Sequence, residues 1–209
     1  MITVVPSYLN GKITISGQKT CMWTIAANAV GCRIEALNTD SFIPDKNIFD
    51  FIEFLQSTGV TTKFNKTKIP EVYYNAALCG NEFYADKIES FILIALVILS
   101  LTKGESRINN IKKLSLTTRD KLYRTIGNLK KMGADISVKG RRATVNGVNR
   151  LHGAKVFAND LRGGSALVLA GLNAEGVSEI YGVNHIKRGY LNIDEKLRTL
   201  GANVKLQKE

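Results

Sequence analysis

Charged residues stand at the start of three apolar stretches in this sequence. Lys19 precedes the stretch that begins at Met22, Asp86 opens the second stretch, and Asp160 and Arg162 open the third. If these stretches form helices, the free N–H groups at their N-termini favour anions. The planar guanidinium of an arginine suits a carboxylate or a phosphate, because it binds two oxygens at once. The chemistry that these positions predict is therefore anion binding.

Each of these side chains also has a purely structural interpretation. Arg188, which is expected to open the last amphipathic helix, is a further candidate for an anion, yet arginines are common on protein surfaces. Asp160 has the residue type that commonly caps a helix N-terminus. The residue types alone leave both interpretations open.

Three copies of one unit supply the elements that position these residues. In each copy an apolar helix ends near a glycine, and a short strand, an amphipathic helix and an alternating strand follow in that order. The glycines Gly31, Gly104 and Gly176 recur at nearly equal spacing, and each stands where a helix C-cap needs a left-handed residue. The apolar helices are predicted over residues 22–30, 86–101 and 161–174, and the strands that follow them over 33–37, 106–111 and 178–183.

The second half of each unit repeats as regularly as the first. The amphipathic helices end at Gly59, Gly133 and Gly201, and they lead into strands predicted over residues 60–64, 135–138 and 203–206. Further strands are predicted over residues 72–78, 143–146 and 155–158, and an N-terminal strand over 11–16 completes the first unit. We therefore expect one domain over residues 1–209, with repeats at approximately 17–80, 81–150 and 151–209.

The apolar character of the first helices predicts how the three units are arranged. Helices that are apolar on all sides need to be buried against one another, and the amphipathic helices and sheets then surround them. This predicts an α/β fold with pseudo-threefold symmetry. A solenoid is less compatible with the pattern, because its units would leave the apolar inner helices without mutual burial.

The positive charge of the chain is concentrated in one segment. The formal net charge is +11, and the excess lies mainly between residues 103 and 142. Such a segment attracts phosphates, nucleic acid or an acidic partner, but a solvated lysine-rich surface would have the same composition. No recognised DNA- or RNA-reading motif accompanies the charge. The basic patch consists of Lys112, Lys113, Arg119, Lys121, Arg124, Lys131, Arg141 and Arg142.

The remaining composition argues for an ordinary cytoplasmic protein. His152 and His185 are too few and too scattered for a metal cluster, and neither a metal nor another cofactor is expected. Cys21, Cys32 and Cys79 are odd in number and form no CxxC pair, which favours buried thiols in the cytoplasm. The apolar run over residues 91–99 is too short to span a bilayer, and the N-terminus lacks the pattern of a signal peptide.

Three motifs of the third unit are unusually specific. They are FANDLRGGSALVLAGLNAEG at residues 157–176, HIKRGY at 185–190 and EKLR at 195–198. These motifs resemble the C-terminal domain of the UDP-N-acetylglucosamine enolpyruvyl transferases, a bacterial family of peptidoglycan synthesis related to EPSP synthase. The second unit is similar to the preceding repeat of the family through KMGAD at 131–135. The segment ISGQK at 15–19 looks like the family's opening strand and hinge lysine. The resemblance covers nearly the whole chain, and it is strongest after about residue 86.

The resemblance implies an inside-out α/β barrel and a set of site residues. Family members have two such domains that face each other across a cleft, and the second domain appears deleted from this sequence. By resemblance, Arg162, Arg188 and Lys19 match residues that hold phosphoenolpyruvate. Asp86 matches a carboxylate beside the attacking sugar hydroxyl, where it would act as a general base. Asp160 matches an acid that transfers a proton or orients the site.

Departures from the family pattern put catalysis in doubt. Thr20 stands where the family has asparagine after its hinge lysine. One family arginine has no clean match, since its position falls near Lys121, with Arg119 and Arg124 as displaced candidates. The mobile loop whose cysteine acts on phosphoenolpyruvate belongs to the other domain, and none of the three cysteines here lies in a matching sequence.

Three functions therefore remain open for this sequence. The first is a non-catalytic relative that binds, regulates or assembles with a partner. The second is half of a split or oligomeric enolpyruvyl transferase, which would pair with another chain or a second copy across its open side and use phosphoenolpyruvate and a UDP-sugar-like acceptor. The third is binding of nucleic acid or an acidic partner through the basic patch. No membrane partner is expected.

Overall fold

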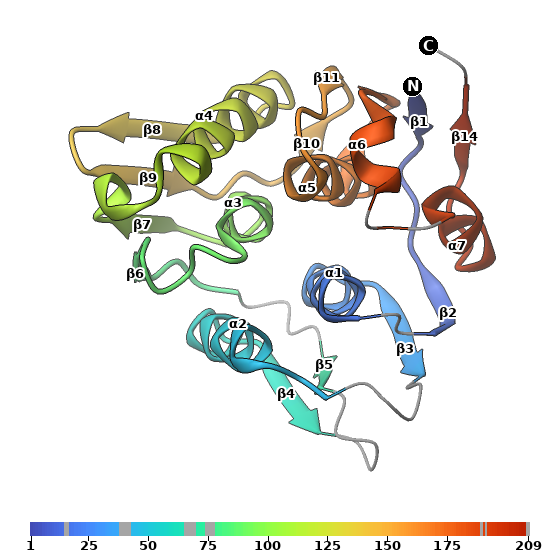
Figure 1. Ribbon diagram of the computed structural model, residues 1–209, viewed down its shortest axis with the longest axis horizontal. Coiled ribbons are helices and arrows are strands. Elements are labelled where there is room, and N and C mark those ends of the chain that lie inside the picture. The colour runs from blue at the N-terminus through green and yellow to red at the C-terminus, as the bar shows by residue number, and fades with distance from the viewer. Residues whose placement is uncertain are drawn as a thin grey trace.

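Three apolar helices occupy the middle of the molecule in the computed structural model (Figure 1). They are α1 (Gln18–Ala29), α3 (Ile92–Ser100) and α5 (Leu161–Leu172). All nine residues of α3 are buried, and α3 packs against both α1 and α5. The structure describes residues 1–14, 17–37, 43–64, 70–73, 78–188, 190 and 192–207. None of its helices in these ranges is long and apolar enough to cross a membrane.

Amphipathic helices cover the central three. They are α2 (Lys46–Ser57), α4 (Leu116–Lys131) and α7 (Ile193–Thr199), with the short α6 (Val183–Lys187) and the 3₁₀ turn η1 (Ile111–Lys113) between them in the chain. Side-chain caps fix where the two longer ones begin: the carboxylate of Asp45 accepts the N–H of Ile48 at 3.1 Å, and Ser115 Oγ accepts the N–H of Thr118 at 3.2 Å.

Two four-stranded sheets have the same sequence of parallel and antiparallel neighbours. The first is β6 (Glu82–Tyr84), β7 (Glu105–Asn109), β9 (Arg142–Asn146) and β8 (Asp135–Lys139). The second is β11 (Lys155–Phe157), β13 (Ser178–Tyr181), β1 (Ile2–Val4) and β14 (Val204–Leu206). In each sheet the first pair is parallel and the other two pairings are antiparallel. Because β1 pairs with β14, the two chain ends lie together (Figure 1).

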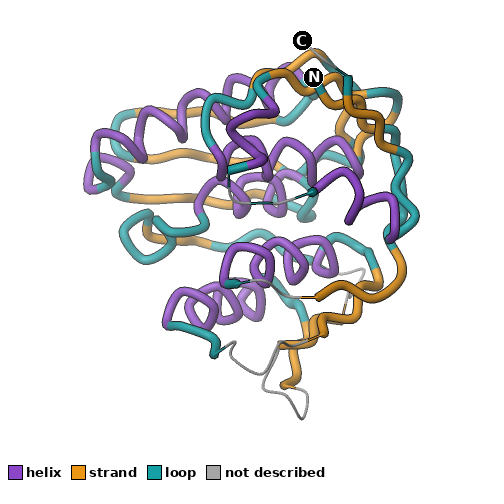
Figure 2. Tube along the Cα trace, turned by 45° about the vertical axis from the view of Figure 1, so that its right-hand side comes forward, coloured by secondary structure: helices purple, strands orange, loops and turns teal. Residues whose placement is uncertain are grey.

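The corresponding strands near the start of the chain form two separate pairs. β2 (Asn10–Thr14) runs parallel to β3 (Arg33–Leu37), and β4 (Thr61–Phe64) runs antiparallel to β5 (Pro70–Tyr73). Among the described residues no pairing joins β3 to β5, although their counterparts β7 and β9 do pair. These strands lie in the lower part of both overall views (Figures 1 and 2). A further small pair joins β10 (Leu151–His152) to β12 (Ala174–Glu175).

The sequence of β5 explains why this sheet stays open. β4 and β8 both begin two residues after a helix-ending glycine, so Pro70 and Glu71 of β5 stand at the positions of Ala143 and Thr144 in β9. Proline has no N–H to donate to a neighbouring strand.

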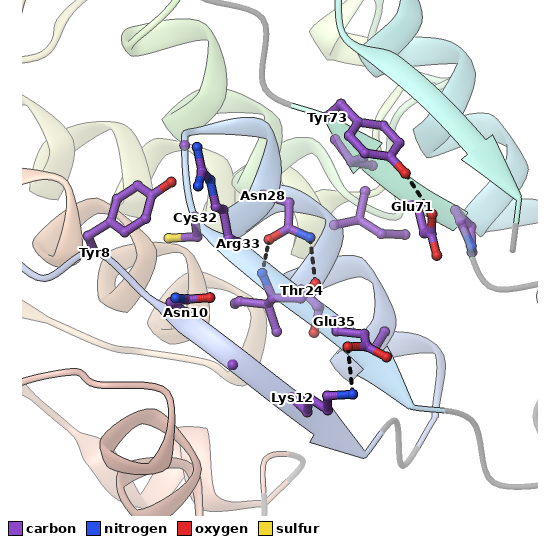
Figure 3. Close-up of a pocket in the computed structure, with 17 residues that line it drawn as sticks. Tyr8, Asn10, Lys12, Thr24, Asn28, Cys32, Arg33, Glu35, Glu71 and Tyr73 are labelled. Carbon is purple, nitrogen blue, oxygen red and sulfur yellow. Dashed lines mark hydrogen bonds and ion pairs between the residues drawn. The ribbon is translucent and has the colours of Figure 1, made fainter.

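A side chain of α1 replaces the missing strand. Asn28 Nδ2 donates to the backbone oxygen of Ile34 in β3, and the N–H of Ile34 donates to Asn28 Oδ1, both at 2.8 Å (Figure 3). The two bonds satisfy backbone groups that would otherwise be buried without a partner. Asn28 is therefore the residue that makes an open sheet tolerable.

The structure confirms the predicted α/β class and corrects several details. The described strands form separate sheets and close no barrel. The helix expected from Asp86 begins only at Ile92, because residues 85–91 form successive turns. The N-terminal strand extends over Asn10–Thr14; residues 15 and 16 of the expected strand, and residues 74–77 of the strand expected over 72–78, lie outside the described ranges. The strand β1 was not predicted.

Replacing Asn28 tests the account of the open sheet. We expect Asn28→Ala to lower the free energy of unfolding by about 1–3 kcal/mol, because it leaves the Ile34 N–H and carbonyl buried without partners. Urea denaturation measures this change. Asn149→Ala, at an exposed position outside the helices and strands, is the control and should have little effect. Equal effects of the two substitutions would contradict the role given to Asn28.

Candidate functional site

A small pocket lies where the N-terminal ends of the three central helices meet. Its volume is about 140 Å³, and residues from the first turns of α1, α3 and α5, or just before them, line it. The sequence placed charged residues at these helix starts, and the fold brings the starts together. Its polar lining residues also include two from the start of α2, so the carboxylate of Asp45 lies at the pocket together with the two cations. They are Gln18, Lys19, Asp45, Asn47, Ser90, Arg162, Ser165 and Tyr190.

Two of the three helix ends at this pocket have no side-chain cap. α1 begins after Gly17 and α3 after Phe91, and neither helix has a side-chain hydrogen bond at its N-cap within the described chain. Helix N-termini without a side-chain cap are places where an anion can accept hydrogen bonds from first-turn N–H groups. α5 differs, because Asp160 Oδ1 accepts the N–H groups of Arg162 at 3.0 Å and Gly163 at 3.2 Å.

Hydrogen bonds hold the start of α5 in place beside the pocket. Ser165 Oγ donates to the backbone oxygen of Arg162 at 2.9 Å, and the indole N–H of Trp23 on α1 donates to the backbone oxygen of Ser165 at 3.0 Å. These bonds tie α5 to α1 directly at the pocket. The side chains of Lys19 and Arg162 are thus presented from two helices whose relative position is fixed.

Tyr190 is a site residue to which the sequence analysis assigned no role. It is 8% exposed, lines the pocket, and its hydroxyl donates to the backbone oxygen of Lys19 at 3.3 Å. Burial raises the pKa of Tyr190, and hydrogen bonding with Ser165 and the charge of Arg162 oppose that rise. The HIKRGY motif contains this tyrosine, but only the fold shows that it reaches α1.

Glu89 is a second residue that sequence reasoning missed. Hydrogen bonds from Thr118 and Ser115 lower the pKa of its carboxyl group, with a smaller contribution from the Arg162 charge, while partial burial opposes this. The N–H and Oγ of Ser115 donate to Glu89 Oε1 at 3.3 and 3.0 Å. This ionised carboxylate links the turn before α3 to the start of α4. Nothing in the sequence pattern distinguished Glu89 from a surface glutamate.

The structure brings some of the predicted site residues together and leaves others apart. Lys19 and Arg162 line the same pocket. Asp160 acts as the cap of α5. Asp86 is exposed and lies 3.6 Å from Lys113 Nζ, and it is not among the residues that line the pocket. Arg188 is exposed at the C-cap of α6, not at the start of an amphipathic helix as expected, and it does not line the pocket either.

A larger cavity of about 680 Å³ occupies the gap between β3 and β5 (Figure 3). It follows the C-terminal half of α1, away from the helix starts, and none of the predicted anion-binding residues lines it. Its charged residues are largely paired: Lys12 lies 3.0 Å from Glu35, and the Tyr73 hydroxyl donates to Glu71 at 2.8 Å, which raises the pKa of Tyr73. The cavity is the consequence of the unpaired sheet.

Two of the three cysteines offer little nucleophilic character, and the expected burial holds only for these two. Burial, assisted by the negative charge of Asp45, raises the pKa of Cys21 to about 12, and burial also raises the pKa of Cys32. A thiol of this kind stays protonated at neutral pH and is a poor nucleophile. Cys79 is exposed. Within the described ranges no three His, Cys, Asp or Glu side chains gather in an arrangement that could hold a metal ion.

Comparisons with known proteins point to one family. The family model for EPSP synthase (3-phosphoshikimate 1-carboxyvinyltransferase) matches residues 18–197. UDP-N-acetylglucosamine 1-carboxyvinyltransferase of Clostridium botulinum is 48% identical over 107 residues, which are 51% of this chain and 24% of that protein. The enzyme of the same name from Coprothermobacter proteolyticus is 56% identical over 81 residues, which are 39% of this chain and 19% of that protein.

Solved structures show the same fold. The enolpyruvyl transferase NikO from Streptomyces tendae aligns with a TM-score of 0.69 and 20% identity, over 90% of this chain and 43% of that one. EPSP synthase from Acinetobacter baumannii aligns with a TM-score of 0.55 and 17% identity, over 86% of this chain and 42% of that one. The chain thus spans less than half the length of these proteins.

Substitutions at Asp160 separate capping from acid chemistry. We expect Asp160→Ala to destabilise the protein by about 1 kcal/mol, because two N–H groups at the start of α5 lose their acceptor. Asp160→Asn keeps an acceptor oxygen and should retain most of the stability. Thermal unfolding of both variants measures the difference. If alanine and asparagine were equally destabilising, the carboxylate charge would matter and the capping role would not suffice.

Proposed function

Because the chain belongs to the EPSP synthase family of 1-carboxyvinyltransferases, we propose that its pocket at the helix starts binds an anion of the phosphoenolpyruvate type. One observation carries this proposal: two uncapped helix N-termini and the cations Lys19 and Arg162 meet at the same pocket. The helix ends supply N–H donors and partial positive charge. Arg162 supplies a planar fork that fits a carboxylate or a phosphate.

The neighbouring residues serve this binding in the proposal. Asp160 fixes the first turn of α5 and so sets the direction from which Arg162 leaves the helix. Tyr190 closes the side of the pocket next to Lys19. Arg188 would join the anion only if the segment after α6 moved toward the pocket. Asp86, the general base by resemblance, would first have to leave Lys113.

In this proposal, the described part of the chain binds an anion but does not catalyse the transfer. A pocket of about 140 Å³ is smaller than the roughly 300–1,000 Å³ typical of small-molecule sites, so it cannot enclose phosphoenolpyruvate together with a UDP-sugar. Rate enhancement in such a transfer requires oriented reactants and exclusion of water. Turnover would therefore need a second wall, supplied by a further segment, another protein or a second copy facing the open side.

The finer features of the architecture belong to the same proposal. We take residues 1–209 as one domain of three repeats in the inside-out arrangement, with the helix starts on its binding side. A cytoplasmic protein of peptidoglycan synthesis is the setting that the related transferases suggest. In this setting the chain acts as a binding, regulatory or assembly component.

A split or oligomeric enolpyruvyl transferase is the alternative. The joint presence of Lys19 and Arg162 at one pocket, with Asp160 capping the helix that carries Arg162, favours it, since a purely structural role does not require this combination. In this alternative a two-walled assembly transfers the enolpyruvyl group of phosphoenolpyruvate to a UDP-sugar and releases phosphate. The purified chain is incubated with phosphoenolpyruvate and UDP-N-acetylglucosamine, and inorganic phosphate is measured. Release of phosphate that is lost on Asp86→Asn would decide for the alternative.

Anion binding is tested by removing the charge of Arg162. We expect Arg162→Gln to weaken phosphoenolpyruvate binding by about tenfold or more, since a charge-assisted hydrogen bond contributes about 1.5–3 kcal/mol. Isothermal titration calorimetry at fixed ionic strength measures the dissociation constant. The control is Arg150→Gln, which removes the same charge from an exposed residue 3.7 Å from Glu175. Equal losses in the two variants would refute a local site.

A further inference from the structure

In the basic segment between residues 103 and 142, some side chains contact a carboxylate or an aromatic ring and others contact neither within the described structure. Three members of the basic patch have partners: Lys113 Nζ lies 3.6 Å from Asp86, Arg124 Nε donates to Asp120 at 2.8 Å, and Lys131 Nζ lies 5.8 Å from the ring centre of Phe157. Lys139, Arg141 and Arg142 form no ion pair with a carboxylate in the part of the chain that the structure describes. Lys103, Lys112, Arg119, Lys121 and Lys130 also form no ion pair among the described residues, but Lys139, Arg141 and Arg142 are the three that line one pocket together, at the turn between β8 and β9.

These three cations face one pocket on the sheet β6–β7–β9–β8. Its volume is about 470 Å³, and every residue that lines it carries a basic, amide or hydroxyl side chain, with no carboxylate among them. The β8–β9 turn that bears it lies at the edge of the molecule opposite β14 (Figure 1). The lining residues are Asn109, Asn110, Lys139, Arg141, Arg142 and Thr144.

Backbone hydrogen bonding holds the turn that carries this pocket. The hairpin turns through Gly140, whose φ of 62° is the left-handed value that a two-residue turn of this kind needs at its first position. The N–H of Ile111 donates to the backbone oxygen of Arg141 at 3.0 Å, which fixes the turn against η1. The backbone of the pocket is thus in place before any ligand arrives, while the side chains of Lys139 and Arg141 are exposed.

The guanidinium of Arg142 is also held in position. Its Nε donates to Asn109 Oδ1 at 2.8 Å, and Asn109 Nδ2 donates in turn to Glu82 Oε1. The two terminal nitrogens of Arg142 have no hydrogen-bond partner among the described residues. An arginine held through Nε with its terminal nitrogens free can bind two oxygens of a phosphate without losing much side-chain entropy.

The arrangement carries a repulsion that an anion would offset. Lys139 and Arg142 are directly opposite in the β8–β9 register, and like charges in that position destabilise a sheet. Arg141 adds a third positive charge in the turn between them. No carboxylate lines the pocket to neutralise these charges.

We propose that this pocket is a binding site for a diphosphate group, separate from the pocket at the helix starts. Three cations match the charge of a diphosphate, and the amides of Asn109 and Asn110 and the hydroxyl of Thr144 add hydrogen-bonding groups at its rim. The volume exceeds the need of a single phosphate. A free pyrophosphate and the diphosphate of a nucleotide offer the same chemistry to these residues.

The test compares two double variants that lose the same charge. Arg141→Gln/Arg142→Gln removes the site, whereas Lys103→Gln/Lys130→Gln removes two exposed cations that do not line it. Binding of inorganic pyrophosphate is measured by isothermal titration calorimetry at 0.15 M ionic strength (roughly physiological), with amide NMR spectra to locate it. We expect the first variant to lose at least about tenfold in affinity and the control to stay within about twofold. Thermal unfolding checks that both variants fold.

Other results of these experiments would overturn the diphosphate site or identify the source of the diphosphate. Equal losses in the two variants, or the largest amide shifts at residues 18–20 instead of 139–144, would overturn the proposal. Tighter binding of a single-stranded RNA than of pyrophosphate, with equal losses in the two variants, would also overturn it in favour of a diffuse nucleic-acid surface. UDP in place of pyrophosphate distinguishes the two sources, because a tighter UDP complex with the same dependence on Arg141 and Arg142 identifies a nucleotide.

Discussion

Mutual burial of three apolar helices is the constraint on which the rest of this structure depends. Every residue of α3 is buried, and α1 and α5 pack against it, so α3 has no free side on which polar groups could stand. Where the three helices meet, polar chemistry is then concentrated at the helix ends. Since the three N-terminal ends meet at one pocket, their partial positive charge and the cations beside them act on the same small volume.

Around this centre, asparagine side chains bond backbone groups of edge strands that have no neighbouring strand on that side within the described ranges. Asn28 of α1 bonds both backbone groups of Ile34, and Asn128 of α4 bonds both backbone groups of Phe157 at 3.0 and 3.2 Å. In each case a helix amide takes the place of a neighbouring strand. The first case leaves a large cavity between β3 and β5, which is a product of sheet geometry and lies apart from the predicted anion-binding residues.

Local pattern predicted those features that depend on local sequence. The helix expected over 161–174 is observed as Leu161–Leu172, because apolar residues, a capping aspartate and a closing glycine all agree there. Features set by contacts distant in the sequence were not predicted. β1 pairs with the strands that begin at residues 178 and 204, and the carboxylate of Asp86 lies beside Lys113 instead of lining the pocket. The early start expected for α3 failed because acidic and polar residues before Phe91 favour turns over a buried helix.

Backbone amide NMR during a titration with phosphoenolpyruvate tests the central claim most directly. If the uncapped helix starts bind the anion, the largest chemical-shift changes will fall on the first-turn amides, at residues 18–20 of α1 and 92–94 of α3. Largest changes at residues 139–144, or small changes spread evenly over the basic surface, would mean that the convergence of the three helices creates no anion site.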